Sequence, residues 1–224
     1  MDVVKKVVYT AIYGNYDQPL KPIVDNPEWD HILFTDNSTL DSNIWQKVIM
    51  KPTRPFLQSR YVKLLYHSTI INKYDLILWI DANILIRCDL NEFAEKNPEE
   101  FVLLKHPDRD NIAEEARVCI KLKKDHASKI NNQVEKYRKV GYKFDNGLAA
   151  TGIMLRRNTD NVKQFCLKWW EELASGSIRD QLSFNYVLWK HPIDVKFLNW
   201  KETFSNEFHY RPHKRWQKQT SLIT

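Results

Sequence analysis

The run LILWI at residues 76–80 constrains the fold of this 224-residue chain more than any other feature. All of its residues are apolar, although neighbouring side chains of a strand point to opposite faces of a sheet. A strand over 75–82 must therefore be covered on both faces, which is typical of the middle of a sheet packed between helices. The run is followed directly by Asp81, Ala82 and Asn83, so polar groups stand at the end of a buried strand.

Strand-like and helix-like patterns alternate along the rest of the chain, which indicates an α/β fold with a mostly parallel central sheet flanked by helices. Further strands are expected at 7–13, 31–36, 45–50, 101–107, 151–157 and 194–199. Helices are expected at 57–71, from 112 to about 141, at 162–173 and at 177–190. From residue 200 onward the periodicity is weak.

Composition narrows the function classes only partly. Hydrophobic residues make up 43% of the chain and charged residues 28%, which predicts a packed core. The net charge of +6 favours an anionic partner: a phosphate ester, nucleic acid or an acidic lipid surface. The three cysteines form no CxxC pair, which suits a reducing compartment. Neither a signal peptide nor an apolar run long enough to span a membrane is recognised, so we expect a cytoplasmic protein.

Parallel α/β sheets bind their ligands beyond the carboxyl ends of the strands. That rule places several polar residues along one edge of the predicted sheet: Tyr13 with Gly14, Asp36, Asp81 with Asn83, and His106. None of them was chosen for its chemistry, so their convergence is the strongest indication of a ligand site.

Asp81 and Asn83 are candidate metal ligands. Strand alternation sends both side chains to one side, with the small Ala82 between them. Carboxylate and amide oxygens suit Mn²⁺ or Mg²⁺, and a diphosphate can supply the remaining ligands. The alternative is that Asp and Asn simply finish the strand, because both are common in turns.

Two pairs on helices are candidates for the ligand's charged and hydroxyl groups. Arg60 and Lys63 share a helical face and can hold a diphosphate, although such a face is more often simply solvated. Asp180 and Gln181 stand in a first helical turn, where they can orient a sugar ring. Alternatively, Asp180 forms a capping box with Ser177.

The remaining candidates lie near strand ends and in the tail. His106 and Arg109 follow a predicted strand, and Thr151 and Gly152 are small residues that let a ligand approach the backbone. The segment FHYRPHKRW at 208–216 offers basic and metal-binding groups. They are His209 or His213 for a metal ion and Lys214 for a phosphate.

Segments from about Val7 to Lys214 together resemble a glycosyltransferase-like family of bacteria and plants that was formerly described as a domain of unknown function. The segments, in chain order, are YTAIYGNYD, RYVKLLYH, YDLILWIDANI, KHPDRDNIAEEA, YRKVGYKFDNGLAATGIMLRRN, WWEEL with GSIRDQLSFNYVLWK, and FHYRPHK. The family is similar to GT-A glycosyltransferases, and most of all to the metal-dependent enzymes related to glycogenin.

The resemblance implies a GT-A catalytic domain over 1–200 and a basic C-terminal segment, 201–224, that closes over the donor site. Together with the observations on strand ends and small residues above, it leads us to expect these roles. Donor binding falls to Thr10, Ala11, Ile12, Tyr13, Asp36, Arg60, Lys63, Asp81, Ala82, Asn83, Thr151, Gly152 and Lys214. Asp180 and Gln181 lie beside the transferred sugar as catalytic residues, and His106 and Arg109 face the sugar or the acceptor. Asp81, Asn83 and His209 bind the metal, with His213 as the alternative to His209.

The expected activity is therefore transfer of a sugar from a nucleotide-diphosphate donor, UDP-linked, to a glycan or glycolipid acceptor with Mn²⁺ or Mg²⁺. Cell-surface polysaccharide synthesis is the expected setting, and the basic tail is expected to contact an acidic membrane surface. Asn83 departs from the family pattern, which has a second Asp there. The main alternative is a non-catalytic module that binds a nucleotide-sugar or a glycan.

Two other classes are less well supported. A phosphatase that uses Asp81 as nucleophile usually needs a second acid two residues on, and Asn83 cannot handle the proton. A nucleic-acid binder is not expected, because no recognised binding motif is present.

Overall fold

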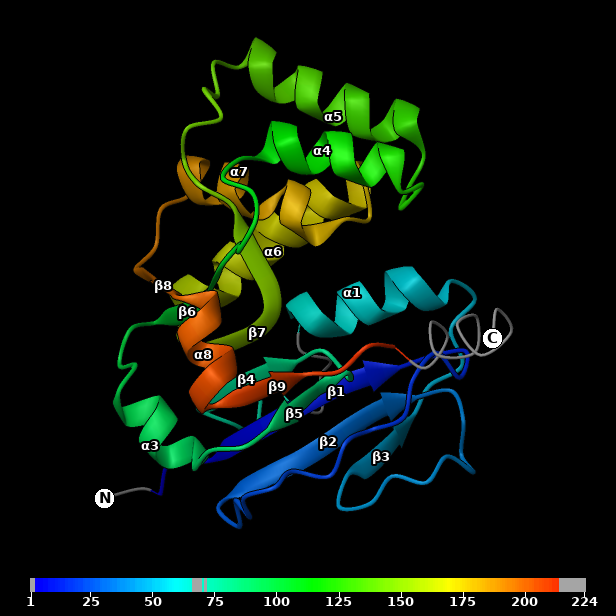
Figure 1. Ribbon diagram of the computed structural model, residues 1–224, viewed down its shortest axis with the longest axis vertical. Helices are drawn as coiled ribbons and strands as arrows, with labels where there is room; N and C mark the ends of the chain where they lie inside the picture. Colours follow the sequence, from blue (N-terminus) through cyan, green and yellow to red (C-terminus); the bar gives the residue numbers. More distant parts are fainter. Residues whose placement is uncertain (1–2, 66–69, 71, 214–224) are drawn as a thin grey trace.

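A seven-stranded sheet forms the centre of the computed structural model, which describes residues 3–65, 70 and 72–213 (Figure 1). The strands stand in the order β3-β2-β1-β4-β7-β6-β8. Their bounds are β1 (Lys6–Ile12), β2 (Trp29–Thr35), β3 (Gln46–Ile49), β4 (Leu76–Ile80), β6 (Phe101–Lys105), β7 (Ala149–Arg157) and β8 (Val195–Leu198).

The LILWI run is β4, and it lies at the middle of the sheet between β1 and β7. All of its residues are buried, as the sequence predicts. β1 pairs in parallel with β2 and β4, β2 with β3, and β6 with β8. β7 alone among these strands runs antiparallel to its neighbours, β4 and β6. The expected α/β fold with a mostly parallel sheet flanked by helices is therefore confirmed.

Two apolar clusters cover the two faces of the sheet, because alternate strand residues point in opposite directions. Val7 and Tyr9 belong to a cluster with residues of α1, α4, α5, α6 and α7 on one face. Val8 belongs to a cluster with residues of α3, of β5 (Ile84–Ile86) and of β9 (Phe208–Tyr210) on the other face. The helices are α1 (Pro55–Leu65), α3 (Leu90–Glu95), α4 (Ile112–Lys121), α5 (Ala127–Lys139), α6 (Asp160–Ser175), α7 (Phe184–Lys190) and α8 (Trp200–Asn206).

A second, two-stranded sheet joins the C-terminal part of the chain to the centre of the molecule. β5 (Ile84–Ile86) follows β4 closely and pairs antiparallel with β9 (Phe208–Tyr210), as Figure 1 shows. Phe208 is fully buried. Neither strand is predicted from the sequence. The strand expected over 75–82 ends at Ile80, and a turn in which Ile84 N donates to Asp81 O leads into β5. The described part of the expected C-terminal segment thus begins with α8 and β9.

Two expected helices are broken. The helical stretch from 112 to 141 is interrupted where Lys123 adopts a left-handed backbone conformation (φ 51°), and α5 begins only at Ala127. The helix expected at 177–190 is a 3₁₀ turn, η1 (Asp180–Leu182), followed by α7. The Ser183 hydroxyl donates to Asp180 O at this break. Ser177 bonds to Asp125 instead of forming a capping box with Asp180. Within the described residues, no helix has the length and apolarity to cross a membrane.

Candidate functional site

A cavity of about 650 Å³ opens beyond the carboxyl ends of β1 and β4. Its size lies within the roughly 300–1,000 Å³ of common ligand pockets. Its lining comes from the end of β1 and the loop after it, from the first turns of α1, from the end of β4, from the turn between α4 and α5, from the residue before η1 and from the C-terminal segment. The lining residues are Ala11, Ile12, Tyr13, Gly14, Tyr16, Asp17, Pro55, Phe56, Ser59, Arg60, Trp79, Asp81, Ala82, Lys124, Arg179, Tyr210, Pro212 and His213.

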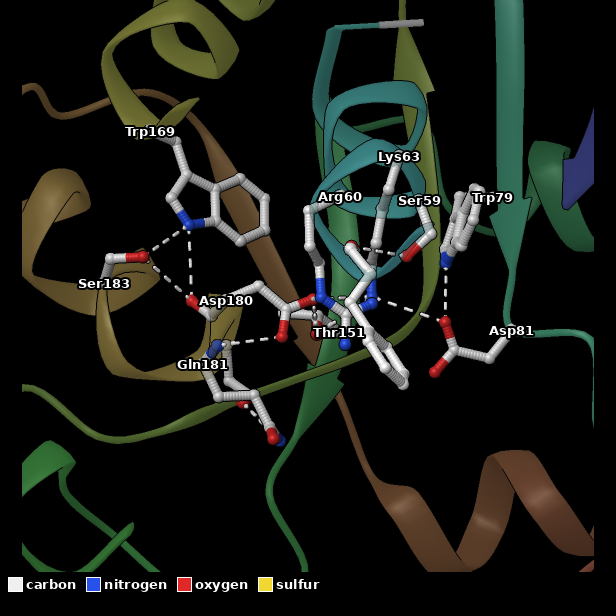
Figure 2. A network of polar contacts seen from close by, with 12 residues as sticks. Ser59, Arg60, Lys63, Trp79, Asp81, Thr151, Trp169, Asp180, Gln181 and Ser183 are labelled. Carbon is white, nitrogen blue, oxygen red and sulfur yellow. Dashed lines mark hydrogen bonds and ion pairs between the residues drawn. The ribbon is translucent and has the colours of Figure 1, made fainter. Parts of the chain in front are cut away.

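Lys63 stands between two carboxylates, as Figure 2 shows. Its Nζ lies 2.7 Å from Asp180 Oδ2 and 3.4 Å from Asp81 Oδ1. It also donates to Thr151 Oγ1 at 3.2 Å, and that hydroxyl donates to Asp180 Oδ2 at 3.0 Å. Lys63 is only 1% exposed, so these partners replace the water that its ammonium loses on burial. Arg60 and Lys63 therefore do not form a simple solvated helix face, which was the alternative for this pair.

Buried groups of β1 and β7 hold the last turn of α1, and with it Lys63. The hydroxyl of Tyr9 and Nη1 of Arg156 both donate to Lys63 O, at 2.8 Å and 3.0 Å. Nη2 of Arg156 also donates to the Tyr9 hydroxyl. The last carbonyls of a helix lack partners within the helix, and here the sheet supplies them. The backbone that carries the Lys63 side chain is therefore fixed by buried groups of two strands.

Asp81 is a carboxylate of the cavity lining, and 39% of its side chain is exposed. Trp79 Nε1 donates to Asp81 Oδ1 at 2.8 Å, which fixes the orientation of the carboxylate. Asp81 N donates to Gly152 O at 2.8 Å. A Cβ atom at Gly152 would lie 3.5 Å from Asp81 Oδ2, so the missing side chain leaves room for this carboxylate.

Asp180 lies behind the cavity wall and is 2% exposed. Burial by itself raises the pKa of its carboxyl, but the charges of Arg60, Lys63 and Arg179 hold that pKa well below its usual range. Arg60 Nε is 3.7 Å from Asp180 Oδ2, and Arg60 also lines the cavity. Asp180 is therefore ionised and anchors cations that face the cavity, although it does not line the cavity itself.

Acidification is expected to destabilise the protein through Asp180. The pKa of this carboxyl is lower in the folded state than the value of about 3.9 in unfolded chains. Its stabilising contribution is thus complete above about pH 4 and is lost as the pH falls toward the folded-state pKa. We expect the urea midpoint of Asp180→Asn to fall less than that of the wild type between about pH 6 and pH 3. Parallel curves for the two proteins would contradict this assignment.

Arg179 is a cavity residue that sequence reasoning missed. Burial lowers the pKa of its guanidinium, but Asp180, Cys119 and Glu115 more than offset this effect, so that its pKa is raised. Its Nε is buried and has no hydrogen-bond partner among the described residues. The only sequence signal was its position next to Asp180. Arg60 and Arg179 give the wall a positive character that favours an anionic ligand.

The predicted donor-binding residues in and near β1 have two kinds of position: some line the cavity, and others lie behind it. Ala11, Ile12 and Tyr13 line the cavity, whereas Thr10 is buried within the strand. Asp36 accepts from Gly14 N with both carboxylate oxygens, each at 3.0 Å. Asp36 therefore supports the loop after β1 and is not itself part of the lining.

His106, Arg109 and Gln181 do not line the cavity. Arg109 Nε pairs with the buried Glu115 at 2.6 Å, and its Nη2 lies 2.7 Å from His106 Nε2. Burial and the charge of Arg109 lower the pKa of His106. Gln181 Nε2 donates to Ala149 O at 3.3 Å. Gln181 thus adjoins Asp180 in the chain, whereas the contacts of Arg109 are with His106 and Glu115, and none of the three residues is part of the cavity lining.

The candidate metal ligands are separated by the structure. Asn83 is 4% exposed, and its amide nitrogen donates to Arg211 O at 2.8 Å. His209 is exposed on β9 and does not line the cavity, whereas His213 does. Lys214 lies outside the described residues.

Among the lining residues that the structure describes, Asp17, Asp81 and His213 carry carboxylate or imidazole groups able to bind a metal ion, and the Asp17 carboxylate contacts the His213 ring. Among residues 3–65, 70 and 72–213, no group of three or more His, Cys, Asp or Glu side chains forms a complete metal site. The donor set fits a hard cation that takes one or two ligands from the protein and the others from phosphate and water, as Mg²⁺ commonly does.

The comparison with family models places the chain among the glycosyltransferase-like domains. Residues 1–210 match the model for TOD1/MUCI70, glycosyltransferase-like domain, so the chain belongs to this family. The resemblance noted from the sequence is thereby confirmed. No curated protein matches the chain.

Two solved structures are similar to this one. The bifunctional glycosyltransferase WbbM, in its apo structure, shares 13% sequence identity over 88% of this chain, with a TM-score of 0.48. This chain covers only 39% of the WbbM chain. Apo mouse xyloside xylosyltransferase 1 shares 11% identity, with a TM-score of 0.48, over 88% of this chain and 85% of its own. Both are distant likenesses, and neither says which reaction this chain performs.

Proposed function

We propose that this chain transfers a sugar from a nucleotide-diphosphate donor, a UDP-sugar, to a glycan or glycolipid acceptor. One observation carries the proposal. In a member of a glycosyltransferase-like family, an exposed carboxylate, Asp81, and the buried Lys63–Asp180 pair meet beside a cavity at the carboxyl ends of β1 and β4.

The donor lies in this cavity with its base against Ala11, Ile12 and Tyr13, and the exposed ring of Phe56 offers an additional stacking surface. Arg60 and Arg179 hold the diphosphate. The leaving nucleotide gains negative charge as the glycosidic bond breaks. Fixed cations therefore stabilise the transition state more than the bound donor.

The cofactor of this proposal is Mn²⁺ or Mg²⁺, held from the protein side by Asp81, with His213 as the histidine that reaches the cavity. Such an ion, when bound, supplies Lewis-acid stabilisation of the departing phosphate. Lys63 orients the Asp81 carboxylate from behind, and Trp79 fixes it from the side.

The sugar side of the proposal rests on Asp180 and Gln181, with Asp180 acting through the Arg60 and Lys63 side chains that it holds. His106 and Arg109 remain proposed acceptor-side residues. The three cysteines are free thiols, which agrees with our proposal of a cytoplasmic reaction. Cell-surface polysaccharide synthesis and contact of the basic tail with an acidic membrane complete the proposal.

Replacing Asp81 tests this function. Wild-type protein is expected to hydrolyse a UDP-sugar with Mn²⁺ and to lose this activity with chelator. Asp81→Ala is expected to lose at least about 100-fold in rate, because its carboxylate holds the ion that stabilises the leaving group. Asp160→Ala, which removes a carboxylate with a 96% exposed side chain, is the matched control and should keep wild-type activity. Equal rates for wild type and Asp81→Ala would contradict the proposal.

A non-catalytic nucleotide-sugar-binding module is the second candidate, and the engagement of Asn83 with Arg211 favours it, because the site then lacks a second metal ligand next to Asp81. Such a module predicts that UDP-sugars raise the melting temperature by mass action, without any hydrolysis or transfer. Turnover that needs both Asp81 and a divalent ion excludes it.

A further inference from the structure

Residues 208–213, which we name the strap, form one wall of the cavity. Tyr210, Pro212 and His213 of the strap line it. At one end the strap pairs with β5, and at the other His213 contacts the Asp17 carboxylate and the ring of Tyr16. The strap therefore crosses from the β5 side to the loop after β1 (Figure 1).

Asn83 holds both backbone groups of Arg211 within the strap. Arg211 N donates to Asn83 O at 2.8 Å, which continues the antiparallel pairing of β5 and β9 by one residue. Arg211 O in turn accepts from the side-chain amide nitrogen of Asn83 at 2.8 Å. The side-chain amide of Asn83 thus donates the hydrogen bond that a backbone N–H donates in an ordinary antiparallel β-ladder.

The chemistry of this contact requires a donor at position 83. Arg211 O is a carbonyl and can only accept, so the atom that faces it must carry a hydrogen. An aspartate at this position would set a carboxylate oxygen against the carbonyl oxygen in a site where Asn83 is 4% exposed. Neither oxygen would have a proton to share, and the new charge would be buried.

We infer that Asn83 is a positioning residue that fixes the strap against the cavity, and that it is not a metal ligand. This inference rests on the proposed function in one respect: the cavity that the strap closes is taken as the nucleotide site. The amide at position 83 then fixes a wall of the cavity instead of supplying a second metal ligand. Of Asp81 and Asn83, Asp81 alone carries a carboxylate.

Hydrogen exchange of the strap tests the inference without any activity measurement. In Asn83→Asp and in Asn83→Ala, peptides covering 208–213 should exchange about tenfold faster than in wild type, the effect of losing one buried hydrogen bond. Asn199→Asp is the matched control, because Asn199 only accepts from Glu202 N, which an aspartate does equally well. Unchanged exchange in both Asn83 variants would overturn the inference.

A second test of the inference measures the binding of UDP and of Mn²⁺ by calorimetry. Asn83→Asp should bind UDP with Mn²⁺ about tenfold more weakly than wild type, because the cavity wall is released. A metal ligand at position 83 predicts the opposite, since an added carboxylate would tighten Mn²⁺ binding, and that result would overturn the inference. If wild-type protein binds neither UDP nor Mn²⁺, the proposed function fails, while strap exchange still decides the role of Asn83.

Discussion

Lys63→Met is expected to lower the free energy of unfolding by about 3 kcal/mol. The substitution keeps the length and apolar stem of the side chain but removes the ammonium 2.7 Å from the buried Asp180 carboxylate. Breaking a buried ion pair on one side leaves a charge without its compensation, which typically costs about 3–5 kcal/mol. The lower figure applies because Arg60 and Arg179 still lower the pKa of Asp180.

Urea denaturation measures this effect. Lys168→Met is the matched control: its Nζ pairs with Glu171 at 2.9 Å on the surface, and its loss should change stability by less than about 1 kcal/mol. Adding Asp180→Asn to Lys63→Met should restore part of the lost stability, because the uncompensated charge is removed. A Lys63→Met protein as stable as the control would show that the ammonium is not needed in this cluster.

Gly152→Val is expected to reduce donor turnover about 100-fold while the protein still folds. A Cβ at this position already meets Asp81 Oδ2 at 3.5 Å and Ile84 Cδ1 at 3.1 Å, so the additional methyl groups of valine would displace the carboxylate. A misplacement of about 1 Å in a catalytic group can cost this factor. The overpacking itself should cost about 1–3 kcal/mol of stability.

UDP-sugar hydrolysis and thermal denaturation of the same samples separate the two effects. Gly152→Ala should lie between wild type and Gly152→Val. In the double variant with Asp81→Ala, the valine should cause no additional loss of rate, because the carboxylate that it displaces is already absent. Wild-type turnover by Gly152→Val would mean that the Asp81 position seen here is not the one used in the reaction.

Those features of the fold and the site that a local sequence pattern marks could be predicted from the sequence. A fully apolar run indicated a central strand, and the rule for parallel sheets then placed Tyr13 and Asp81 at one edge, where both line the cavity. Helical spacing put Arg60 and Lys63 on one face, and both now contact Asp180.

The rest depends on contacts between distant parts of the chain. The direction of β7 leaves no mark in its own sequence, and β5 and β9 are too short to show a period. Tyr9 and Arg156 hold Lys63 from other strands, and neither lies in a pattern that reports on the site. The Asn83 contact with Arg211 likewise joins residues far apart in the sequence.

The antiparallel course of β7 has a consequence for how such a molecule can diversify. β6 and β7 are neighbours in which Lys105 pairs with Ala149, so the excursion that carries α4 and α5 leaves and re-enters the sheet at the cavity edge. The turn between these helices contributes Lys124 to the cavity lining. Exchanging residues 106–148 between relatives would therefore change the part of the cavity lining that this segment supplies, while every strand keeps its neighbours.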